Sequence, residues 1–451
     1  MWGYAMQDDG LVQPEQARPM TVAVVGLGKI GLPLAVQYAQ HGYRVLGCDS
    51  NERVVAAINA GHSHVQEEAE LATAVPRLVK EGLLAATGET ARAVQQADVV
   101  VVIVPVWVNE QHEIDFSALD AATGSIAQGL RAGTLVIYET TLPVGTTARR
   151  LRPLLERGSQ LRAGEDFSLA YSPERVSSGH IFRDLRSYPK IVGGIDERST
   201  ERAAHFYRSV LECTVMTMAS CDEAEFVKLI ETTYRDVNIA LANEYARYAD
   251  QHGLNVFDAI AAANTQPYSH IHMPGVGVGG HCIPVYPYFL FANPLDEGYE
   301  TPFALPLLAR QTNDVMAEYT VQRVERAIGS LDTLPVLILG VAYRGNVRET
   351  AFSSAKLLQK ALLRRGAQVY AHDPLFSDNE LRQLGYVPLP LGLESAVYAI
   401  ILQGNHHEYE TFDFHRFTRC KVVMDGRHAL NKAVIEASGM RYLAVGDGSP
   451  L

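Results

Sequence analysis

A cysteine that follows a run of glycines is the feature of this sequence with the clearest chemical potential. Cys282 ends the segment Gly275-Val-Gly-Val-Gly-Gly-His-Cys. Glycine permits positive φ angles and lets a ligand approach the backbone closely. A thiolate in such a loop is a nucleophile for an aldehyde or acyl carbon. A single cysteine is more often a small buried hydrophobe, but the glycines and the adjoining His281 favour the nucleophile.

A lysine and a glutamate offer complementary chemistry. Lys228 has apolar neighbours in the helical segment 224–230, so it can point inward and hold an oxyanion or activate water. A solvated lysine paired with Glu225 or Glu231 fits the same spacing equally well. Glu174 follows an expected strand, a position suited to general acid or base work. A solvated loop acid is the alternative there.

The segment Gly26–Gly31 reads Gly-Leu-Gly-Lys-Ile-Gly and matches the dinucleotide fingerprint G-x-G-x-x-G between a strand and a helix. Gly26 permits the tight turn, Gly28 the approach of a pyrophosphate, and Gly31 close packing of helix and strand. Asp49 lies about 20 residues further on, where a carboxylate binds ribose hydroxyls and repels a 2′-phosphate. The segment therefore predicts NAD rather than NADP. The alternative is a glycine turn with a solvated aspartate.

Short β-branched and apolar runs alternate with helical segments, a pattern typical of a doubly wound parallel sheet. A helix is expected over 32–40. The strands expected in this first part are 21–25, 43–48, 99–104, 135–138 and 167–171. Thr140 and Thr141 follow one of them, where their hydroxyls can hold a water or cap a helix.

The character of the chain changes after about residue 219. Residues 221–263 are nearly free of Gly and Pro, which predicts one very long helix and then a second. A second α/β part follows, with strands expected at 335–340, 369–371, 399–402 and 422–424. The predicted parts are a disordered leader (1–20), a first α/β domain (21–213), a central helical domain (214–330) and a second α/β domain (331–451).

Composition narrows the function classes. The chain has 451 residues and a formal net charge of −12, which argues against nucleic acid or an anionic membrane as partner. Its five cysteines are scattered, which predicts neither a zinc site nor a disulfide framework and fits a cytoplasmic location. No apolar run reaches the ~18 residues that span a bilayer.

Taken together, these segments resemble the UDP-glucose/GDP-mannose dehydrogenase family from about Val22 to Ala444. The matching segments are Gly26–Gly31, Thr140–Thr147, Ser172–Gly179, Lys190–Gly194, Glu225–Glu244, Pro274–Pro284, Gly340–Arg344 and Asp425–Arg427. The resemblance implies two Rossmann-like domains joined by a long central helix, and a homodimer formed through that helix.

The resemblance also implies a reaction. Two NAD are reduced in turn while the C6 alcohol of a nucleotide sugar becomes an aldehyde and then a carboxylate, commonly for polysaccharide biosynthesis. Cys282 would carry a thiohemiacetal and then a thioester, which water hydrolyses. Lys228 would stabilise the oxyanion, Glu174 would act on the hydrolytic water, and Thr141 would position water or nicotinamide. Thr232, one turn after Lys228, is the remaining implied catalytic residue.

The implied binding residues fall into two sets. Those for NAD are Gly26, Leu27, Gly28, Lys29, Ile30, Gly31, Asp49, Arg53, Pro105, Val106 and Thr141. Those for the nucleotide sugar are Arg175, Val176, Lys228, Arg235, His270, His272, Gly275, Gly279, Tyr343, Arg344 and Arg427.

The sequence departs from the family pattern at four places. Thr232 stands where Asn is usual, and Tyr286 where Asp is usual. Val106-Trp107 replaces Thr-Pro, and Ala351 replaces Arg. Tyr286 exchanges a carboxylate for a weak phenolic donor, so these changes bear on thioester hydrolysis and on NAD contacts.

Two motifs resemble the branch of the family that acts on UDP-N-acetylhexosamines. They are Pro173–Val176 and His281–Ile283. The alternatives are a UDP-glucose or GDP-mannose 6-dehydrogenase, a variant that stops at the aldehyde, and a binding module without turnover.

Overall fold

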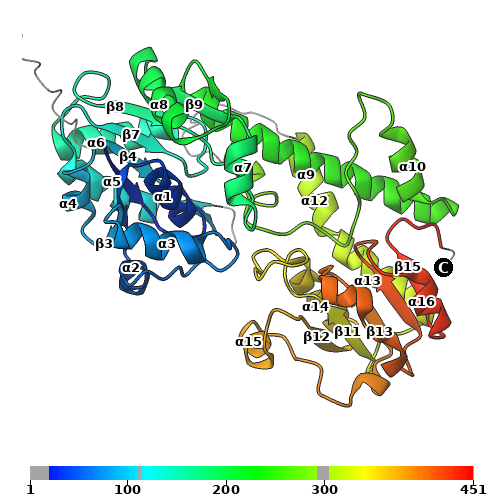
Figure 1. The fold of residues 1–451 in the computed structure, drawn as a ribbon. Helices are drawn as coiled ribbons and strands as arrows, with labels where there is room; N and C mark the ends of the chain where they lie inside the picture. The colour runs from blue at the N-terminus through cyan, green and yellow to red at the C-terminus, as the bar shows by residue number, and fades with distance from the viewer. Residues whose placement is uncertain (1–19, 110–112, 292–303, 450–451) are drawn as a thin grey trace, which may run out of the picture. The chain divides into compact units, whose positions relative to one another are not determined.

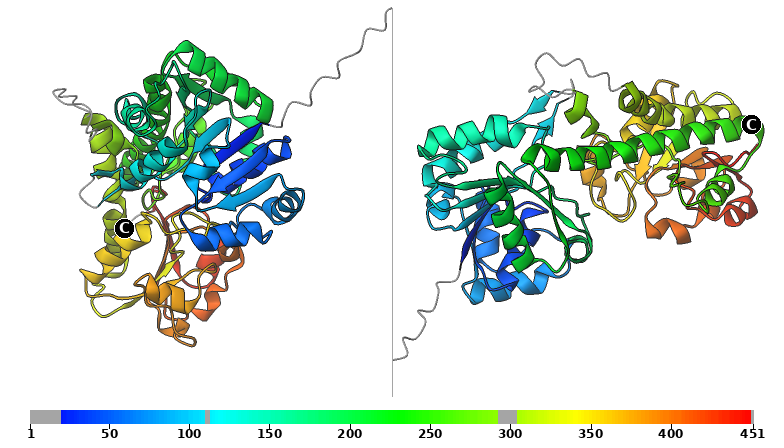
Figure 2. Two further views of the ribbon diagram at one scale, coloured as in Figure 1. Left: turned by 90° about the vertical axis from the view of Figure 1, so that its left-hand side faces the viewer. Right: turned by 90° about the horizontal axis from the view of Figure 1, so that it is seen from above.

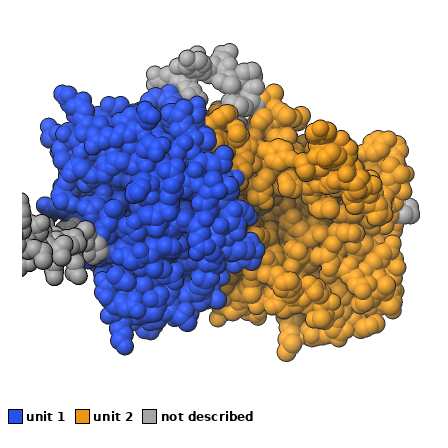
Figure 3. All heavy atoms as spheres, turned by 45° about the horizontal axis from the view of Figure 1, so that its top comes forward, with its two compact units in different colours: residues 1–106, 116–140, 147–224 blue, residues 107–115, 141–146, 225–451 orange. Residues whose placement is uncertain are grey.

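The computed structural model describes residues 20–109, 113–291 and 304–449. The chain forms two compact units, coloured separately in Figure 3. Unit 1 contains residues 1–106, 116–140 and 147–224, and unit 2 contains residues 107–115, 141–146 and 225–451. The leader expected over 1–20 lies, apart from Met20, outside the described residues.

Unit 1 is built on an eight-stranded sheet with the order β10-β9-β8-β7-β4-β1-β2-β3. Its strands are β1 (Thr21–Val25), β2 (Arg44–Cys48), β3 (Leu84–Thr87), β4 (Val99–Val102), β7 (Leu135–Tyr138), β8 (Ser168–Tyr171), β9 (Lys190–Gly194) and β10 (Val215–Thr217). All neighbouring pairs are parallel except β8 with β9. The central strands are buried throughout, which explains their continuous apolar composition.

The helices of unit 1 form groups on the two faces of this sheet, the doubly wound arrangement that the sequence predicts (Figure 1). One group contains α1 and α3, and another contains α4, α5 and α6. The bounds are α1 (Gly31–Gln40), α2 (Glu52–Asn59), α3 (Leu71–Lys80), α4 (Thr90–Val94), α5 (Ser117–Gly129), α6 (Arg152–Ser159), α7 (Ile181–Ser187) and α8 (Glu197–Val210), with a π-helical turn η1 (Thr147–Leu151).

Unit 2 contains most of the long helix α9 (Cys221–His252), which Figure 2 shows as one continuous rod. Its other elements before the second sheet are the short β5–β6 pair (Trp107–Val108, Ile114–Asp115) and the helices α10 (Val256–Ala263), α11 (Pro287–Phe291), α12 (Ala304–Asp314) and α13 (Met316–Ile328). Buried ion pairs fix α9 to two of these helices. Asp236 binds Arg310 of α12 at 2.6 Å, and Asp250 binds Arg323 of α13 at 2.8 Å.

The second sheet is five-stranded and fully parallel, with the order β12-β11-β13-β14-β15. Its elements are β11 (Pro335–Leu339), α14 (Ser354–Leu363), β12 (Gln368–His372), α15 (Asp378–Gln383), η2 (Glu394–Ala396), β13 (Ala399–Leu402), η3 (His407–Thr411), η4 (Phe414–Arg416), β14 (Val422–Asp425), α16 (Lys432–Ala437) and β15 (Arg441–Ala444). None of the helices in the described part of the chain combines the length and apolar composition needed to cross a bilayer.

Candidate active site

The glycine turn of unit 1 follows β1 and leads directly into α1. Gly26 has φ +95°, and its N–H donates to the Cys48 carbonyl at 2.8 Å. A Cβ on Gly31 would lie 1.8 Å from the Gly26 oxygen, so the close packing expected at this position is present. A Cβ on Gly28 would meet no protein atom within 4 Å. Gly28 therefore leaves its backbone accessible at the start of a helix, where N–H groups favour an anion.

The acid of the fingerprint lies beside this turn. The two carboxylate oxygens of Asp49 accept hydrogen bonds from Leu27 N at 2.9 Å and Asn51 N at 2.8 Å. Each oxygen retains a lone pair, and the side chain is only half-buried, so ribose hydroxyls can also bind it. Lys29 pairs with Glu67 at 2.9 Å, and Arg53 is exposed in the first turn of α2. The turn, the helix and the acid together fit an NAD molecule.

The remaining residues expected at the NAD site occupy both units. Pro105 and Val106 follow β4, the neighbour of β1, with Pro105 exposed and Val106 buried. Thr140 donates from its hydroxyl to the Val104 carbonyl at 2.7 Å, which fixes the chain end of β7 to that of β4. Thr141 belongs to unit 2, where it is buried.

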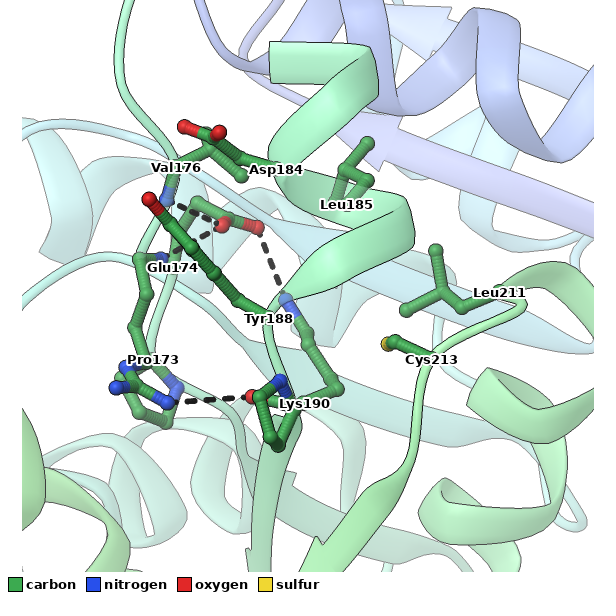
Figure 4. A pocket seen from close by; sticks show the side chains of 11 residues that line it. Pro173, Glu174, Val176, Asp184, Leu185, Tyr188, Lys190, Leu211 and Cys213 are labelled. Atoms are coloured by element: carbon green, nitrogen blue, oxygen red, sulfur yellow. Dashed lines mark hydrogen bonds and ion pairs between the residues drawn. The ribbon is translucent and has the colours of Figure 1, made fainter. Parts of the chain in front are cut away.

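Glu174 is held tightly rather than solvated (Figure 4). One carboxylate oxygen accepts from the N–H groups of Arg175 at 2.6 Å and Val176 at 3.0 Å. The other accepts from the Lys190 ammonium at 2.9 Å. Burial raises the pKa of Glu174, but Lys190, a side-chain hydrogen bond with Glu139 and the backbone donor of Arg175 outweigh it and lower the pKa overall. The Arg175 guanidinium donates to the Pro189 carbonyl at 3.2 Å.

Lys190 and Glu139 belong to this site although the sequence reasoning assigned them no role. Glu139 is completely buried and accepts from Lys190 at 2.8 Å. The sequence did contain a signal for Lys190, since it is a charged residue that opens an otherwise apolar strand, β9. Glu139 follows the buried strand β7 in the same way.

In unit 2, Cys282 is half-buried at the end of the glycine loop. Its carbonyl accepts from Val285 N at 3.2 Å and Tyr286 N at 2.9 Å, and this turn brings Tyr286 back beside the cysteine. Burial and the adjacent Cys282 raise the pKa of Tyr286 well above its ordinary value, whereas a side-chain hydrogen bond with Thr141 lowers it. The phenol therefore contacts both Cys282 and Thr141, two of the expected catalytic residues.

Three further residues of unit 2 that could take part in the chemistry lie on α9 or next to the cysteine in the chain. Lys228 is only 8% exposed, which excludes the solvated alternative. The Thr232 hydroxyl donates to the carbonyls of Lys228 and Leu229 at 3.0 and 3.2 Å, so its hydrogen is bonded to the backbone of its own helix. The imidazole of His281 lies 3.6 Å from a Glu349 carboxylate oxygen.

Three asparagines fix the loop before Cys282. Asn238 on α9 donates to the His270 carbonyl at 2.7 Å and accepts from His272 N at 2.8 Å. Asn243, also on α9, accepts from Gly275 N at 2.9 Å. Asn264 binds both main-chain groups of the residue between the two histidines. Arg235, also on α9, lies close enough to lower the pKa of His272, an effect that adds to the larger one of burial.

The loop glycines are needed because the second α/β part packs against them. A Cβ on Gly279 would lie 2.8 Å from Tyr343 Cβ, and one on Gly275 would lie 2.9 Å from the Gly426 carbonyl oxygen. Gly280 has φ +95° and lies over the Tyr343 ring. At these positions other parts of the protein pack closely against the loop backbone, whereas the sequence suggested that a substrate would approach it.

Arg427 fastens the same loop. Its guanidinium donates to the Gly277 carbonyl at 3.0 Å and to the backbone and side-chain oxygens of Gln403 at 2.6 and 3.2 Å. Burial lowers its pKa to about 10. Arg344 lies with its guanidinium carbon 5.8 Å from the Tyr343 ring centroid. Among the residues expected around the nucleotide sugar, Tyr343 and Arg427 of unit 2 therefore pack against the cysteine loop, whereas Arg175 and Val176 belong to unit 1.

Comparisons with known proteins identify the family of this chain. The chain matches the models of the UDP-glucose/GDP-mannose dehydrogenase family for the NAD binding domain over residues 20–211, the central domain over 222–315 and the UDP binding domain over 337–432. The UDP-N-acetyl-D-mannosamine dehydrogenase of Pyrococcus horikoshii is 34% identical over 436 residues, covering 95% of this chain and 100% of that protein.

Solved structures agree as well. The structure of the UDP-D-ManNAc dehydrogenase from Pyrococcus horikoshii superposes with a TM-score of 0.85 and 34% identity, over 95% of this chain and 100% of that one. A UDP-glucose dehydrogenase from Pyrobaculum islandicum has a TM-score of 0.84 and 28% identity, over 96% and 99%. The chain belongs to the UDP-glucose/GDP-mannose dehydrogenase family, and its fold is two Rossmann-like α/β domains connected by the central helix α9.

Proposed function

We propose that this protein is an NAD-dependent nucleotide-sugar 6-dehydrogenase that oxidises the C6 hydroxyl of a UDP-sugar to the uronate. The observation that carries the proposal is Cys282, which is half-buried on the glycine loop and in contact with Tyr286, whose phenol also bonds to Thr141. In this proposal residues 21–213 bind NAD, residues 214–330 supply the cysteine loop, and residues 331–451 bind the nucleotide.

The reaction passes through two oxidations and one hydrolysis. NAD supplies the hydride acceptor for both oxidations. The Cys282 sulfur adds to the C6 aldehyde to give a thiohemiacetal, which the second oxidation converts to a thioester. Lys228, buried on α9, holds the oxygen that becomes negative. Water then attacks the thioester carbon, and the sulfur leaves with the electron pair of the C–S bond.

Tyr286 changes how that water is activated. Since the pKa of its phenol is raised well above the ordinary value, the phenol stays protonated and donates a hydrogen bond, but it cannot take a proton from water. We assign the base role to Glu174. We expect Tyr286→Phe to slow hydrolysis by about tenfold, the effect on the rate of losing one hydrogen bond to a charged group.

Glu174→Gln should stall the enzyme with sugar attached to Cys282, which intact-protein mass spectrometry detects. Equal hydrolysis rates in Glu174→Gln and the parent would contradict this assignment.

A UDP-N-acetylhexosamine is the substrate that we favour. The relative from Pyrococcus horikoshii is named for UDP-N-acetyl-D-mannosamine, and the motifs around Glu174 and Cys282 resemble that branch. UDP-glucose and GDP-mannose are the alternatives. The test is a panel of UDP- and GDP-sugars with NAD, in which NADH is counted per sugar consumed. Two NADH support the proposal, one supports an enzyme that stops at the aldehyde, and none with any sugar supports a binding module.

We also propose a homodimer formed through α9. Large apolar side chains that are at least 41% exposed occur at spacings of three, four and seven residues, which places them on one helix face. They are Phe226, Ile230, Tyr234, Leu241, Tyr245 and Tyr248. Such a face is typical of a surface that another chain covers. Light scattering after chromatography should give twice the chain mass, and Tyr234→Glu with Leu241→Glu should give a monomer. A parent protein of single-chain mass would contradict the dimer.

We further propose a cytoplasmic location. The five cysteines are scattered and odd in number, a composition that fits a compartment where thiols stay reduced. Fractionation of the source cells tests this, and recovery of the protein outside the cytoplasm would contradict it.

A further inference from the structure

Three charged side chains from neighbouring strands meet inside unit 1. Glu139 follows β7, Glu174 lies three residues beyond the end of β8, and Lys190 is the first residue of β9. The Lys190 ammonium lies 2.8 Å from one Glu139 oxygen and 2.9 Å from one Glu174 oxygen. One cation therefore serves two carboxylates. Figure 4 shows the half of this cluster that faces the small cavity beside Glu174.

Besides Lys190 and the Glu174 carboxylate, two groups from helices face Glu139. Tyr38 of α1 and Tyr207 of α8 both donate to its second oxygen, at 3.1 and 2.5 Å. The Lys190 ammonium also lies 4.9 Å from the Tyr207 ring centroid. Each oxygen of Glu139 thus has a donor, and these donors stabilise its ionised form against burial.

The surroundings of Glu174 are different. Its cavity measures about 10 Å³, enough for about one water. The other titratable groups that line it are Arg175, Asp184, Tyr188 and Cys213. Asp184 is engaged elsewhere, by Ser177 N at 3.0 Å and by the Arg183 guanidinium at 2.9 Å. The ion pair that the structure shows for Glu174 is the one with Lys190, at 2.9 Å.

Charge balance decides whether Glu174 can act as a base. If Lys190 were paired with Glu174 alone, protonation of Glu174 would leave a buried ammonium without a counter-charge, which is strongly unfavourable. With Glu139 present, Lys190 keeps one ionised partner after Glu174 takes a proton. The cluster then changes from a net charge of −1 to zero, and no charge is left unpaired.

We propose that Glu139 is a positioning residue for proton transfer at Glu174, because through Lys190 it provides the counter-charge that lets the Glu174 carboxylate take a proton from the hydrolytic water. The inference rests on the proposed function, in which Glu174 activates that water. One water O–H bond breaks, its proton bonds to Glu174, and its oxygen bonds to the thioester carbon. The sulfur of Cys282 leaves with the C–S electron pair, and Lys190 remains an ammonium throughout.

The active form of the cluster has Glu139 ionised. Burial raises the pKa of Glu139 to about 7. Lys190 opposes this shift and the neighbouring Glu174 carboxylate adds to it, whereas the pKa of Glu174 is lowered. The hydrolysis rate should therefore rise with pH around neutrality, as Glu139 loses its proton.

Glu139→Gln and Tyr207→Phe test this in the intact enzyme with the sugar that gives two NADH. Glu139→Gln keeps the volume and removes the counter-charge, so we expect the hydrolysis-limited kcat to fall at least 30-fold, KM to change less than threefold, and sugar to accumulate on Cys282. Tyr207→Phe removes a donor from the ionised Glu139, which raises the pKa of Glu139. The rise of kcat with pH should then move to higher pH. Tyr43→Phe, which removes a phenol bonded at 2.6 Å to Ser209 on the same helix, should leave the pH profile unchanged.

The experiment gives different results if this inference fails and if the proposed function fails. If the parent protein makes no NADH with any sugar, the proposed function fails first. If the parent makes two NADH per sugar, but Glu139→Gln keeps its kcat or Tyr207→Phe leaves the pH profile in place, the role of Glu139 is refuted. Should Glu139→Gln not fold, the shift with Tyr207→Phe still decides the question.

Discussion

The two α/β units begin with nearly the same turn. In unit 1, Gly26 has φ +95° and its N–H donates to the carbonyl of Cys48, the last residue of β2. In unit 2, Gly340 has φ +84° and its N–H donates to the carbonyl of His372, the last residue of β12. Both N–H···O distances are 2.8 Å. The residue after each of these carbonyls is an aspartate that accepts from the backbone just after the glycine, at 2.9 Å for Asp49 and 2.7 Å for Asp373.

The segments after the two turns differ. Helix α1 begins at Gly31, five residues after the first glycine, whereas α14 begins at Ser354, fourteen residues after Gly340. The position of the open Gly28 is taken in unit 2 by Ala342, which is fully buried. The second turn therefore has no helix end or accessible backbone to offer a pyrophosphate.

The two aspartates differ as well. Asp49 is half-buried and can accept from a ribose, but Asp373 is 2% exposed and faces the imidazole of His406 at 3.1 Å. The other ring nitrogen of His406 accepts from Asn346 N at 3.0 Å, so the nitrogen near Asp373 is the donor. A shared strand-turn-helix scaffold thus becomes a dinucleotide site only where the glycine and the acid stay accessible.

The largest expected effect concerns the buried acid. Asp373→Ala leaves the N–H groups of Val341, Ala342 and Leu375 without their acceptor, which should lower the free energy of unfolding by about 4 kcal/mol. NAD affinity should not change. Denaturant unfolding and NAD titration measure the two quantities, and weaker NAD binding by the folded variant would break the comparison.

Asp373 also gives a pH test. Burial raises its pKa, but His406 and backbone donors outweigh this, so the pKa in the folded protein is lowered. A lowered carboxyl pKa contributes stability above the unfolded value of about 3.9 and loses it as pH falls toward the folded value. The acid sensitivity of unfolding should therefore decrease in Asp373→Asn. Identical acid unfolding curves for the variant and the parent would contradict this assignment.

Gly31→Ala should have the next largest effect. The new Cβ would lie 1.8 Å from the Gly26 oxygen, so strand and helix must separate. We expect a loss of about 3 kcal/mol in unfolding free energy, with NAD binding weakened as well. Calorimetry checks stability, and an unchanged melting temperature would show that the turn is not as tightly packed as described.

Gly28→Ala is the matched control, and we expect it to have the smallest effect on stability. The same methyl group meets no protein atom within 4 Å, so stability should stay the same. The NAD Kd should rise about tenfold, because the methyl group stands where a phosphate would approach the backbone. A stable protein with unaltered NAD affinity would place the pyrophosphate elsewhere.

Much of this fold could be predicted from the sequence because buried parallel strands are apolar and β-branched. The expected strand 99–104 ends at Val102, however, and the next residue, Ile103, lies against the Gly26 turn, where a Cβ on Gly26 would be 2.9 Å from the Ile103 oxygen. Strands β3 and β10 were missed because their residues, Leu-Ala-Ala-Thr and Val-Met-Thr, give no long apolar run. The apolar residues of α9 also divide between two faces of the helix, since Leu229 is buried and Ile230 is exposed. The sequence pattern alone does not show which apolar residues lie on the buried face.

The candidate site could be predicted where the spacing of residues along the chain defines a motif. The glycine fingerprint and Asp49 have a fixed order along the chain, and the structure brings them together. The cluster of Glu139 with Lys190 was not predictable, because it depends on which strands become neighbours and on the antiparallel insertion of β9 beside β8. The anchoring of Arg427 to Gly277 depends in the same way on tertiary packing between distant segments.

The most direct test of the central claim, a covalent sugar intermediate on Cys282, is a count of NADH and uronate made by Cys282→Ser. A serine hydroxyl cannot replace the thiolate as nucleophile and leaving group. The account predicts at most one NADH per sugar and no uronate, from a protein that still binds NAD and the nucleotide sugar. Uronate formation at the parent rate by this variant would contradict the thioester route.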